Sequence, residues 1–377
     1  MQKKKLLMFH PALAPYGIDQ FNFLNEHFDF EIVFLFEDVQ YDKFNQQKLL
    51  SQLRCKYSFL LKGIRFGKDR ILRFGMWKMI KKNQPDIVVG YEYSLTTLYL
   101  IFLKRLGLIR AKIGSTIDDS LSMCLHEKSG IHKFARQYSV KHLDYLILFS
   151  NEVANFYQQE FSVAKTNTIV FPVLQSEKRL KKEPEQIETI AARLVSEYHL
   201  EGKRALLYAG RLTEAKGLLQ FIENMIPALR EESDLVWVMV GNGNEYEAIK
   251  NKITENQLDD KILLPGRFEG NELYAWYLCA SGFVLPSVFE PYGAVVNEAL
   301  LFGLRVMCSC YAGSRELISP DNGVVFDPLN ENETKAKLQN FISSIPAVNI
   351  HLSDKKSLMI QDCNHLFWKE WEKALLV

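Results

Sequence analysis

Short apolar segments recur along the chain, and helix-length amphipathic stretches separate them. In the first half these segments are rich in Leu, Ile, Val and Phe, and they begin near Leu6, Glu31, Asp86, Lys112, Tyr145 and Asn167. A second series begins near Arg204, Leu235, Lys261, Gly282, Arg305 and Gly323. Apolar strands that alternate with helices predict parallel sheets covered by helices on both faces.

The two series predict an α/β protein built from two Rossmann-like, doubly wound domains. A polar and charged segment, 174–186, lies between them and is typical of a linker. We therefore expect a first domain at residues 1–173 and a second at residues 174–354. The final stretch, 355–377, carries an apolar face with Phe367, Trp368 and Trp371, which predicts a terminal helix docked on the protein.

The segment 289–303 (FEPYGAVVNEALLFG) follows an apolar run and predicts a strand, a loop and the start of a helix. Ligands bind outside the carboxyl ends of strands in open α/β sheets, where helix N-termini present N–H groups. Glu290 lies in this loop and Glu298 in the expected helix, so both carboxylates could face one ligand. The alternative is that Glu290 is an ordinary loop carboxylate and Glu298 a solvated helix residue.

The setting of these two glutamates, E-P-Y-G-x-V-x-x-E-A-L-x-x-G, resembles the signature of the family-four retaining glycosyltransferases of the GT-B fold. The resemblance implies two domains that face each other across a cleft, with the terminal helix 355–377 packed back on the first domain. It also implies that Glu290 lies by the donor sugar and that Glu298 binds the nucleotide ribose. Gly293 and Ala294, between them, would lie on the donor side.

The first strand of the second series runs into GRLTEAKG, residues 210–217. Gly210 permits a tight turn, and Arg211 and Lys216 lie at a strand end and a helix start. Because charge develops on a departing diphosphate, fixed cations lower the barrier to breaking its bond to a sugar. The resembling enzymes carry Arg and Lys at matching positions, which implies this role here. The alternative is a pair of solvated surface cations.

Two more loops are expected on the donor side. Gly241 opens a G-N-G turn after a strand, but G-x-G-x-x-G is not completed, so no dinucleotide fingerprint is present. Arg267 lies where the resembling enzymes hold the nucleotide base, and the implied donor is a UDP- or GDP-sugar. No Asp-x-Asp motif suits a metal-bridged diphosphate, and we expect no metal and no other cofactor.

Candidate acceptor-side residues follow three strands of the first domain. His10 and Gly17 lie after the first strand, in a loop where many resembling enzymes carry a cation instead of Gly17. Asp118 follows the strand near Lys112 and could accept the proton of an acceptor hydroxyl; Glu92 is a similar candidate. The alternatives are a core histidine at position 10 and a helix N-cap made by Asp118 or a neighbouring serine.

Composition adds few constraints. The 377 residues are 47% hydrophobic and 24% charged, and 46 basic residues balance 45 acidic ones, so the overall charge does not argue for nucleic acid. Six cysteines without a C-x-x-C pair favour reduced thiols and a cytoplasmic protein. The apolar run near the N-terminus is too short for a signal peptide, and no stretch is long enough to cross a bilayer.

Charge is concentrated in segment 54–82, which contains ten basic residues and one acid, Asp69. Aromatic and aliphatic residues are mixed with the cations at what we take to be helical spacing. This mixture suits the surface of an anionic membrane. A solvated basic face and a nucleic-acid surface are the alternatives.

The resemblance to the family-four glycosyltransferases implies a hexosyltransferase that retains anomeric configuration. It would move a sugar from a nucleoside-diphosphate donor to a hydroxyl of a glycan or lipid-linked acceptor, in the synthesis of a surface polysaccharide such as lipopolysaccharide or capsule. We expect it in the cytoplasm, in peripheral contact with the inner face of the membrane. The alternatives are a non-catalytic sugar-nucleotide or glycan-binding protein of the same fold and, among enzymes, a sugar phosphorylase or epimerase.

Overall fold

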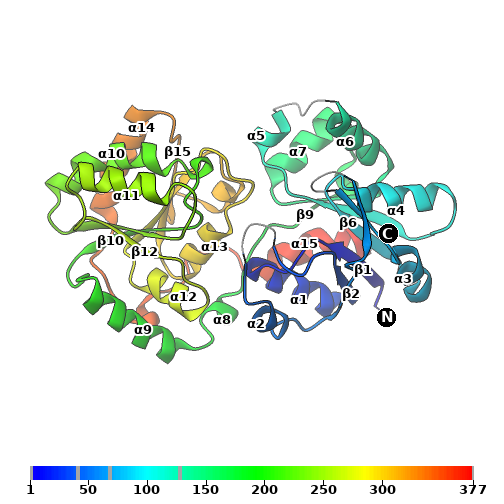
Figure 1. The fold of residues 1–377 in the computed structure, drawn as a ribbon, viewed down its shortest axis with the longest axis horizontal. Coiled ribbons are helices and arrows are strands. Elements are labelled where there is room, and N and C mark those ends of the chain that lie inside the picture. The colour runs from blue at the N-terminus through cyan, green and yellow to red at the C-terminus, as the bar shows by residue number, and fades with distance from the viewer. Residues whose placement is uncertain (1–2, 40–42, 67–69, 126–129, 376–377) are drawn as a thin grey trace. The chain divides into compact units, whose positions relative to one another are not determined.

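A computed structural model describes residues 3–39, 43–66, 70–125 and 130–375 (Figure 1). The chain forms two compact units. Unit 1 contains residues 1–175 and 363–377, and unit 2 contains residues 176–362. Each has its own parallel sheet with helices on both faces, as the alternation of apolar segments predicts.

The sheet of unit 1 has seven strands in the order β3-β2-β1-β6-β7-β8-β9. The strands are β1 (Lys5–His10), β2 (Asp29–Phe34), β3 (Lys56–Phe59), β6 (Ile87–Tyr91), β7 (Lys112–Ile117), β8 (Tyr145–Leu148) and β9 (Thr168–Val170). The register is parallel throughout, with Lys5 opposite Asp29 and Leu6 opposite Ile87. The central strands are buried on both faces, which is why they are almost continuously apolar.

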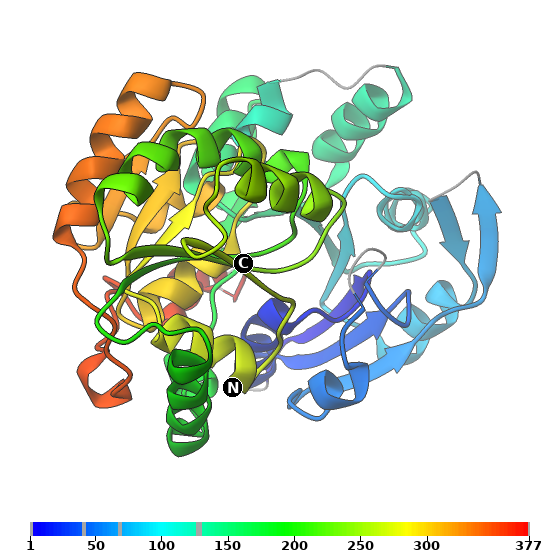
Figure 2. The same cartoon turned by 60° about the vertical axis from the view of Figure 1, so that its left-hand side comes forward.

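Helices cover this sheet on both sides (Figure 2). They are η1 (Pro15–Gly17), α1 (Ile18–His27), α2 (Gln46–Leu50), α3 (Met76–Asn83), α4 (Leu95–Arg105), α5 (Leu121–Leu125), α6 (Ile131–His142), α7 (Asn151–Glu160), η2 (Lys165–Asn167) and α15 (Cys363–Leu375). Side-chain caps mark several of their starts: the Ser94 hydroxyl accepts from the backbone of Thr97, and the Ser150 hydroxyl accepts from that of Val153.

The helical spacing expected for segment 54–82 is wrong for most of its length. Only α3 is helical; before it come β3 and a hairpin of β4 (Gly63–Phe66) and β5 (Arg70–Arg73), which forms a small sheet of its own (Figure 2). Ile64 pairs with Leu72 across the hairpin, so its apolar residues face strand partners. Arg73 fixes the hairpin to the unit, because its guanidinium donates to the carbonyls of Leu35 and Leu61. Lys68 and Asp69 lie outside the described residues.

The sheet of unit 2 has six strands in the order β12-β11-β10-β13-β14-β15. The strands are β10 (Arg204–Ala209), β11 (Leu235–Val240), β12 (Ile262–Gly266), β13 (Gly282–Leu285), β14 (Arg305–Ser309) and β15 (Gly323–Phe326). The helical elements are α8 (Glu177–Leu180), α9 (Pro184–Glu197), η3 (Glu214–Lys216), α10 (Leu218–Glu231), α11 (Tyr246–Glu255), α12 (Asn271–Leu278), α13 (Ala294–Leu301), η4 (Gly313–Leu317), α14 (Glu331–Ser344) and η5 (Leu352–Asp354). All six strands arise where the apolar pattern predicts them.

The segment expected to be a linker, 174–186, is mostly structured. Residues 174 and 175 end unit 1, and α8 and the first turn of α9 take up much of the remainder. The charged composition hid one apolar anchor, Leu180, which is fully buried in the core of unit 2. Pro184 opens α9, a position where proline suits a helix because the missing N–H would have no partner there.

The expected terminal helix, 355–377, begins later than its apolar face suggested. Residues 355–362 belong to unit 2, and the helix α15 starts at Cys363. The reason is a set of contacts that hold the segment in a non-helical path. The Lys355 ammonium donates to the Ala280 carbonyl at 2.9 Å, and the backbone N–H of Leu358 donates to Leu300 at 2.8 Å.

Helix α15 joins unit 1 through aromatic rings. Phe367 contacts Phe23 of α1 and Phe171, with ring centroids 5.2 and 4.6 Å apart, and Trp371 contacts Phe28 at 5.5 Å. The Phe367 and Trp371 side chains are both buried. Unit 1 is therefore completed by a segment that lies almost 200 residues after its other strands and helices.

We predict that Trp371→Ala destabilises unit 1 by about 3–5 kcal/mol, because it removes a fully buried indole and leaves a cavity. The matched control is Trp368→Ala on the same helix, which removes a 37% exposed ring and is expected to cost about 1 kcal/mol or less. Urea unfolding followed by circular dichroism measures both. Equal losses in the two variants would contradict this account of how α15 docks.

Candidate active site

Strand order in unit 2 places two loops side by side. Strands β11 and β12 lie on one side of β10, and strands β13, β14 and β15 lie on the other. Such a switch point leaves a crevice at the carboxyl ends of the strands. The loops that follow β10 and β13 meet there, since the backbone N–H groups of Val288 and Phe289 both donate to the Ala215 carbonyl at 3.0 Å.

Glycines are required where these loops approach neighbouring backbone. A Cβ atom on Gly241 would lie 1.8 Å from the Gly210 carbonyl oxygen, and one on Gly217 would lie 2.7 Å from that of Pro286. Gly217 also has a φ of 63°, in the left-handed region that favours glycine. The structure thus brings Gly210 and Gly241 into direct contact and gives the G-N-G turn a packing reason.

Lys216 and Glu290 form an ion pair at the junction of these loops. Their side chains are only 12% and 10% exposed. Lys216 is therefore not a solvated surface cation, and Glu290 is not an ordinary solvated loop carboxylate. The Ser287 hydroxyl donates to the same carboxylate oxygen of Glu290 at 3.4 Å. A buried pair of this kind holds a cation and an anion ready at a strand end.

Arg211 lies in the same loop as Lys216, directly after β10, and it contacts Tyr208, which lies on that strand. The Tyr208 hydroxyl donates to the Arg211 carbonyl at 2.7 Å. Burial raises the pKa of Tyr208 well above its usual value, the negative charge of Glu290 raises it further, and the Arg211 guanidinium opposes this shift. Tyr208 is therefore close enough to both charged groups to respond to them.

Glu298 is buried within α13, so it is not the solvated helix residue of the alternative interpretation. The hydroxyl of Tyr277, on α12, donates to its Oε2 atom at 2.7 Å. Burial and the charge of Glu298 both raise the pKa of Tyr277, which remains a neutral donor.

Of the remaining donor-side candidates, Gly293 and Ala294 lie next to Glu290 and α13, whereas Arg267 forms an ion pair in another loop. Gly293 has a φ of 89°, and a Cβ there would lie 3.3 Å from Cγ of Glu290, so this turn packs on the glutamate. Ala294 is the first residue of α13. Arg267 is engaged elsewhere, in a partly exposed ion pair with Glu269 at 2.7 Å.

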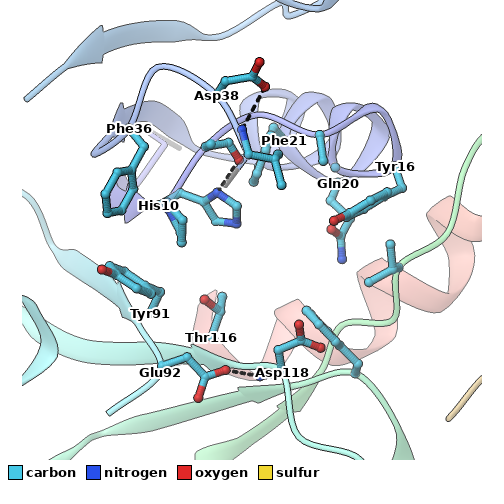
Figure 3. A pocket seen from close by; sticks show the side chains of 17 residues that line it. His10, Tyr16, Gln20, Phe21, Phe36, Asp38, Tyr91, Glu92, Thr116 and Asp118 are labelled. Atoms are coloured by element: carbon cyan, nitrogen blue, oxygen red, sulfur yellow. Dashed lines mark hydrogen bonds between the residues drawn. The ribbon is translucent and has the colours of Figure 1, made fainter. Parts of the chain in front are cut away.

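Unit 1 contains a pocket of about 600 Å³ at the carboxyl ends of β1, β6 and β7 (Figure 3). Aromatic rings and carboxylates dominate its lining. All four acceptor-side candidates border it: His10, Gly17, Glu92 and Asp118. The structure therefore brings together residues from three separate loops that the sequence could only place at strand ends.

His10 ends β1 and packs edge-on against Phe21 and Phe34, with ring centroids 5.1 and 6.4 Å apart. It is therefore both a packed strand-end histidine and a lining residue of the pocket. Its Nδ1 atom lies 3.1 Å from the Ala12 carbonyl, which only accepts, so Nδ1 carries the proton and Nε2 is left as an acceptor. Burial lowers the pKa of His10 to about 4, so the ring is neutral near pH 7.

Glu92 and Asp118 are joined directly. The backbone N–H of Asp118 donates to Oε1 of Glu92 at 2.7 Å (Figure 3). Glu92 itself is held at a φ of 48°, an uncommon conformation for a glutamate, by two further hydrogen bonds: its N–H donates to Thr116, and its carbonyl accepts from the Ser115 hydroxyl. Strain held in this way is typical of a preorganised site.

The side-chain cap at the start of α5 is made by Ser120 and not by Asp118. The Ser120 hydroxyl accepts a hydrogen bond from the backbone N–H of Met123. Gly17 lies at the pocket rim as the residue before α1, where a Cβ atom would lie 3.0 Å from the Phe21 ring. It contributes no side chain to the pocket, and no charge.

Residues 194–349, which contain all of the donor-side candidates, match the family of glycosyl transferases group 1. This part of the chain is therefore a glycosyl transferases group 1 domain. Two known proteins illustrate the sequence similarity of the chain. An uncharacterized glycosyltransferase of Methanocaldococcus jannaschii is 29% identical over 34% of this chain and 33% of its own length. Sucrose synthase of Melioribacter roseus is 25% identical over 82% of this chain and 42% of its own length, so the chain matches less than half of either protein.

A solved structure shares the fold of this chain. Anabaena HepE in complex with UDP and glucose superposes with a TM-score of 0.69 at 16% identity, over 99% of this chain and 100% of that one. The fold is therefore GT-B, and in this chain its two Rossmann-like sheets have seven and six strands. The sequence predicted both the family and this fold.

Several residues of the candidate site escaped the sequence analysis. Tyr208 and Tyr277 look like core aromatics, and nothing local marks them as partners of Arg211 and Glu298. Asp119 follows the candidate Asp118 directly in the sequence, and no motif marks it as functional. Its carboxylate accepts from the Tyr157 hydroxyl at 2.6 Å.

Asp119 also lies 3.5 Å from Arg136, which donates to Tyr157 at 3.0 Å. These three buried residues come from separate elements and anchor the loop that carries Asp118. Only the tertiary structure brings them together. Among the residues with described positions, no group of three or more His, Cys, Asp and Glu side chains could hold a metal ion.

We predict that His10 makes unit 1 sensitive to acid. Its pKa is about 4 in the folded protein and 6.5 unperturbed, so the unfolded state binds more protons between these values. Stability is therefore lost as pH falls from about 6.5 toward 4. The difference in unfolding free energy between wild type and His10→Gln should shrink by roughly 1–3 kcal/mol over that window. Urea unfolding at pH 7, 5.5 and 4.5 measures it, and a difference independent of pH would contradict the burial of a neutral ring.

Proposed function

We propose that this glycosyltransferase moves a hexose from a nucleoside-diphosphate sugar to a hydroxyl of a glycan or lipid-linked acceptor, with retention of anomeric configuration. The observation that carries the proposal is the buried Lys216–Glu290 pair at a strand-end switch point, with Arg211 in the same loop as Lys216 and Glu298 on the helix that follows Glu290. This set combines two cations with two carboxylates, which suits a diphosphate joined to two polyhydroxyl groups.

Arg211 and Lys216 would stabilise the leaving diphosphate. As the bond between the sugar C1 and the diphosphate oxygen breaks, the electron pair stays on the diphosphate, and the acceptor oxygen bonds to C1. Lys216 pairs with Glu290 in the ligand-free protein, so a bound diphosphate offers its ammonium a second anionic partner. Glu290 would then accept hydrogen bonds from the sugar hydroxyls. Glu298, oriented by Tyr277, would accept them from the ribose.

The pocket of unit 1 would receive the acceptor. Asp118 and Glu92 both border it, joined by the hydrogen bond from the Asp118 backbone to the Glu92 carboxylate, and either side chain could accept the proton that the reacting hydroxyl loses. Asp118 is our first candidate because the buried contacts of Asp119 with Arg136 and Tyr157 fix its loop.

The complex of HepE with UDP and glucose makes a UDP-hexose the first donor to examine, and GDP-sugars are the second. A thermal-shift panel of UDP- and GDP-sugars would identify the base and the sugar. The alternative function, a sugar-nucleotide-binding protein without catalysis, shares the binding result. Slow hydrolysis of the donor in the absence of acceptor separates the two, because only an enzyme would release the nucleoside diphosphate and the free sugar.

We predict that Arg211→Ala and Glu298→Ala each weaken binding of the preferred nucleotide sugar by about 10- to 150-fold. Each removes a charged hydrogen bond worth about 1.5–3 kcal/mol. Isothermal titration calorimetry measures the change. The matched control is Arg193→Ala, which removes an exposed ion pair with Glu272 in the same unit and should leave affinity unchanged. Wild-type affinity in both site variants would contradict the assignment.

We also propose a peripheral contact with an anionic membrane, made by the hairpin β4–β5 and the start of α6. Ile64 and Phe66 on the hairpin are about half exposed, and Ile131 and Phe134 on α6 are 69% and 68% exposed. Arg70 of β5 lies 3.3 Å from His132 of α6, so the two elements are neighbours.

Exposed cations accompany these apolar residues, namely Lys62, Arg65, Arg70 and Lys133. Apolar side chains ringed by cations match a bilayer surface with anionic headgroups. A lipid-linked acceptor would be reached from such a surface. Within the described parts of the chain, no helix has the length and apolar character needed to cross a bilayer.

We predict that the protein sediments with phosphatidylglycerol vesicles at least tenfold more strongly than with phosphatidylcholine vesicles at 0.1 M salt. The double variant Ile131→Asp/Phe134→Asp should abolish the difference, because it removes the apolar contacts and adds negative charge. Leu329→Asp, at a 55% exposed position in unit 2, is the control and should bind as wild type. Equal binding to both vesicles would contradict the membrane contact. Tight, salt-sensitive binding of an oligonucleotide in its place would favour a nucleic-acid surface.

A further inference from the structure

We infer that the pocket of unit 1 selects an acceptor sugar that is neutral or carries an amine, and that it rejects sugars with a phosphate or carboxylate near the reacting hydroxyl. This inference rests on the proposed function, since it names the acceptor class of that site. The geometry points to it because the charged side chains that border the pocket are carboxylates, and none of the described lining residues is a lysine or arginine.

Three groups at the pocket accept hydrogen bonds. His10 is neutral and presents Nε2, because its Nδ1–H is used by the Ala12 carbonyl. Glu92 and Asp118 present carboxylates on the opposite wall (Figure 3). Hydroxyl and ammonium groups are donors and can bind to all three. A phosphate or carboxylate has no proton to donate near pH 7 and would be repelled by two like charges.

No compensating cation lines the pocket. Of the described residues that border it, none is a lysine or arginine. The third carboxylate, Asp38, is used by its own loop, where it accepts from the backbone of Val39 at 2.8 Å and from the Gln46 amide at 2.7 Å. Gly17 occupies the rim without a side chain. An anionic acceptor would therefore meet two carboxylates without a side-chain counter-charge in the lining.

Two weaker positive groups lie behind the lining. Arg73 sits 4.7 Å from the centre of the Phe36 ring, but both its terminal nitrogens donate to the carbonyls of Leu35 and Leu61. The N-terminus of α1 adds at most about half a positive charge, and Asp19 in its first turn offsets this. Neither group places a cationic side chain in the lining, so the charged side chains there remain the carboxylates.

Aromatic rings supply the remaining contact area. Tyr16, Phe21, Phe36, Tyr91 and Phe149 border the pocket. Apolar faces of this kind pack against the C–H faces of a sugar ring, while a few fixed polar groups set its orientation. A neutral sugar can use both kinds of contact, whereas an anionic substituent can use neither.

The test compares monosaccharide probes that differ in charge: methyl β-glucoside, methyl β-glucosaminide, methyl β-glucuronide and glucose 6-phosphate. Ligand-observed NMR on the full chain, with UDP present, measures the binding of each, so no turnover is required. We expect the neutral and amine probes to bind at least tenfold more tightly than the two anions. Equal or tighter binding of the anions would overturn the inference, and so would failure of all four probes to bind while UDP binds.

A pair of variants at one position supplies the control. Gly17→Arg adds a cation at the rim and should narrow the gap between neutral and anionic probes at least fivefold. Gly17→Gln adds the same Cβ atom beside Phe21 without the charge, and should leave the gap unchanged.

Glu92→Gln offers a second route if the rim variants fold poorly, because it removes one negative charge at almost constant volume and should also narrow the gap. If neither route changes the gap, the charge argument is wrong. If the wild-type chain does not bind UDP, that result counts against the proposed function. UDP binding is measured independently of the binding of the monosaccharide probes.

Discussion

The buried ion pair of Lys216 and Glu290 is the interaction on which the donor-side site depends. Removing two charges from water costs several kcal/mol per ion, and their attraction recovers this only when the geometry and the additional hydrogen bonds are good. Here the Ser287 hydroxyl and the backbone bonds from Val288 and Phe289 to Ala215 hold the two loops together. Such a pair contributes little net stability, so its burial is better explained by a ligand that uses both charges.

The same constraint shapes both units. Parallel strands bring all their carboxyl ends to one edge, so residues far apart in sequence become neighbours there. In unit 2 this edge is tightened by glycines, since Gly241 touches the Gly210 carbonyl in a way that no larger residue could. In unit 1 it is tightened by hydrogen bonds, which hold Glu92 in a left-handed conformation against the backbone of Asp118. Both arrangements fix charged groups before a ligand arrives, which reduces the reorganisation that binding requires.

Regular patterns made much of the fold predictable. Central strands such as β11 are apolar on both faces, and the glutamate motif lies within one continuous segment. The hairpin β4–β5 was missed because its cations and apolar residues also fit a helix, and only cross-strand pairing distinguishes the two. The late start of α15 depends on the buried ammonium of Lys355, a contact between distant segments. Tyr277 and Asp119 were missed for the same reason, because their partners lie on other elements.

The most direct test of the account is amide hydrogen exchange of the full chain with and without UDP, followed by mass spectrometry. The central claim is that a nucleoside diphosphate binds across the loops after β10 and β13. It predicts that UDP slows exchange in peptides covering residues 210–217 and 290–300, while exposed segments such as α14 are unchanged. Slowed exchange confined to other parts of the chain, with these two segments unaffected at saturating UDP, would contradict it.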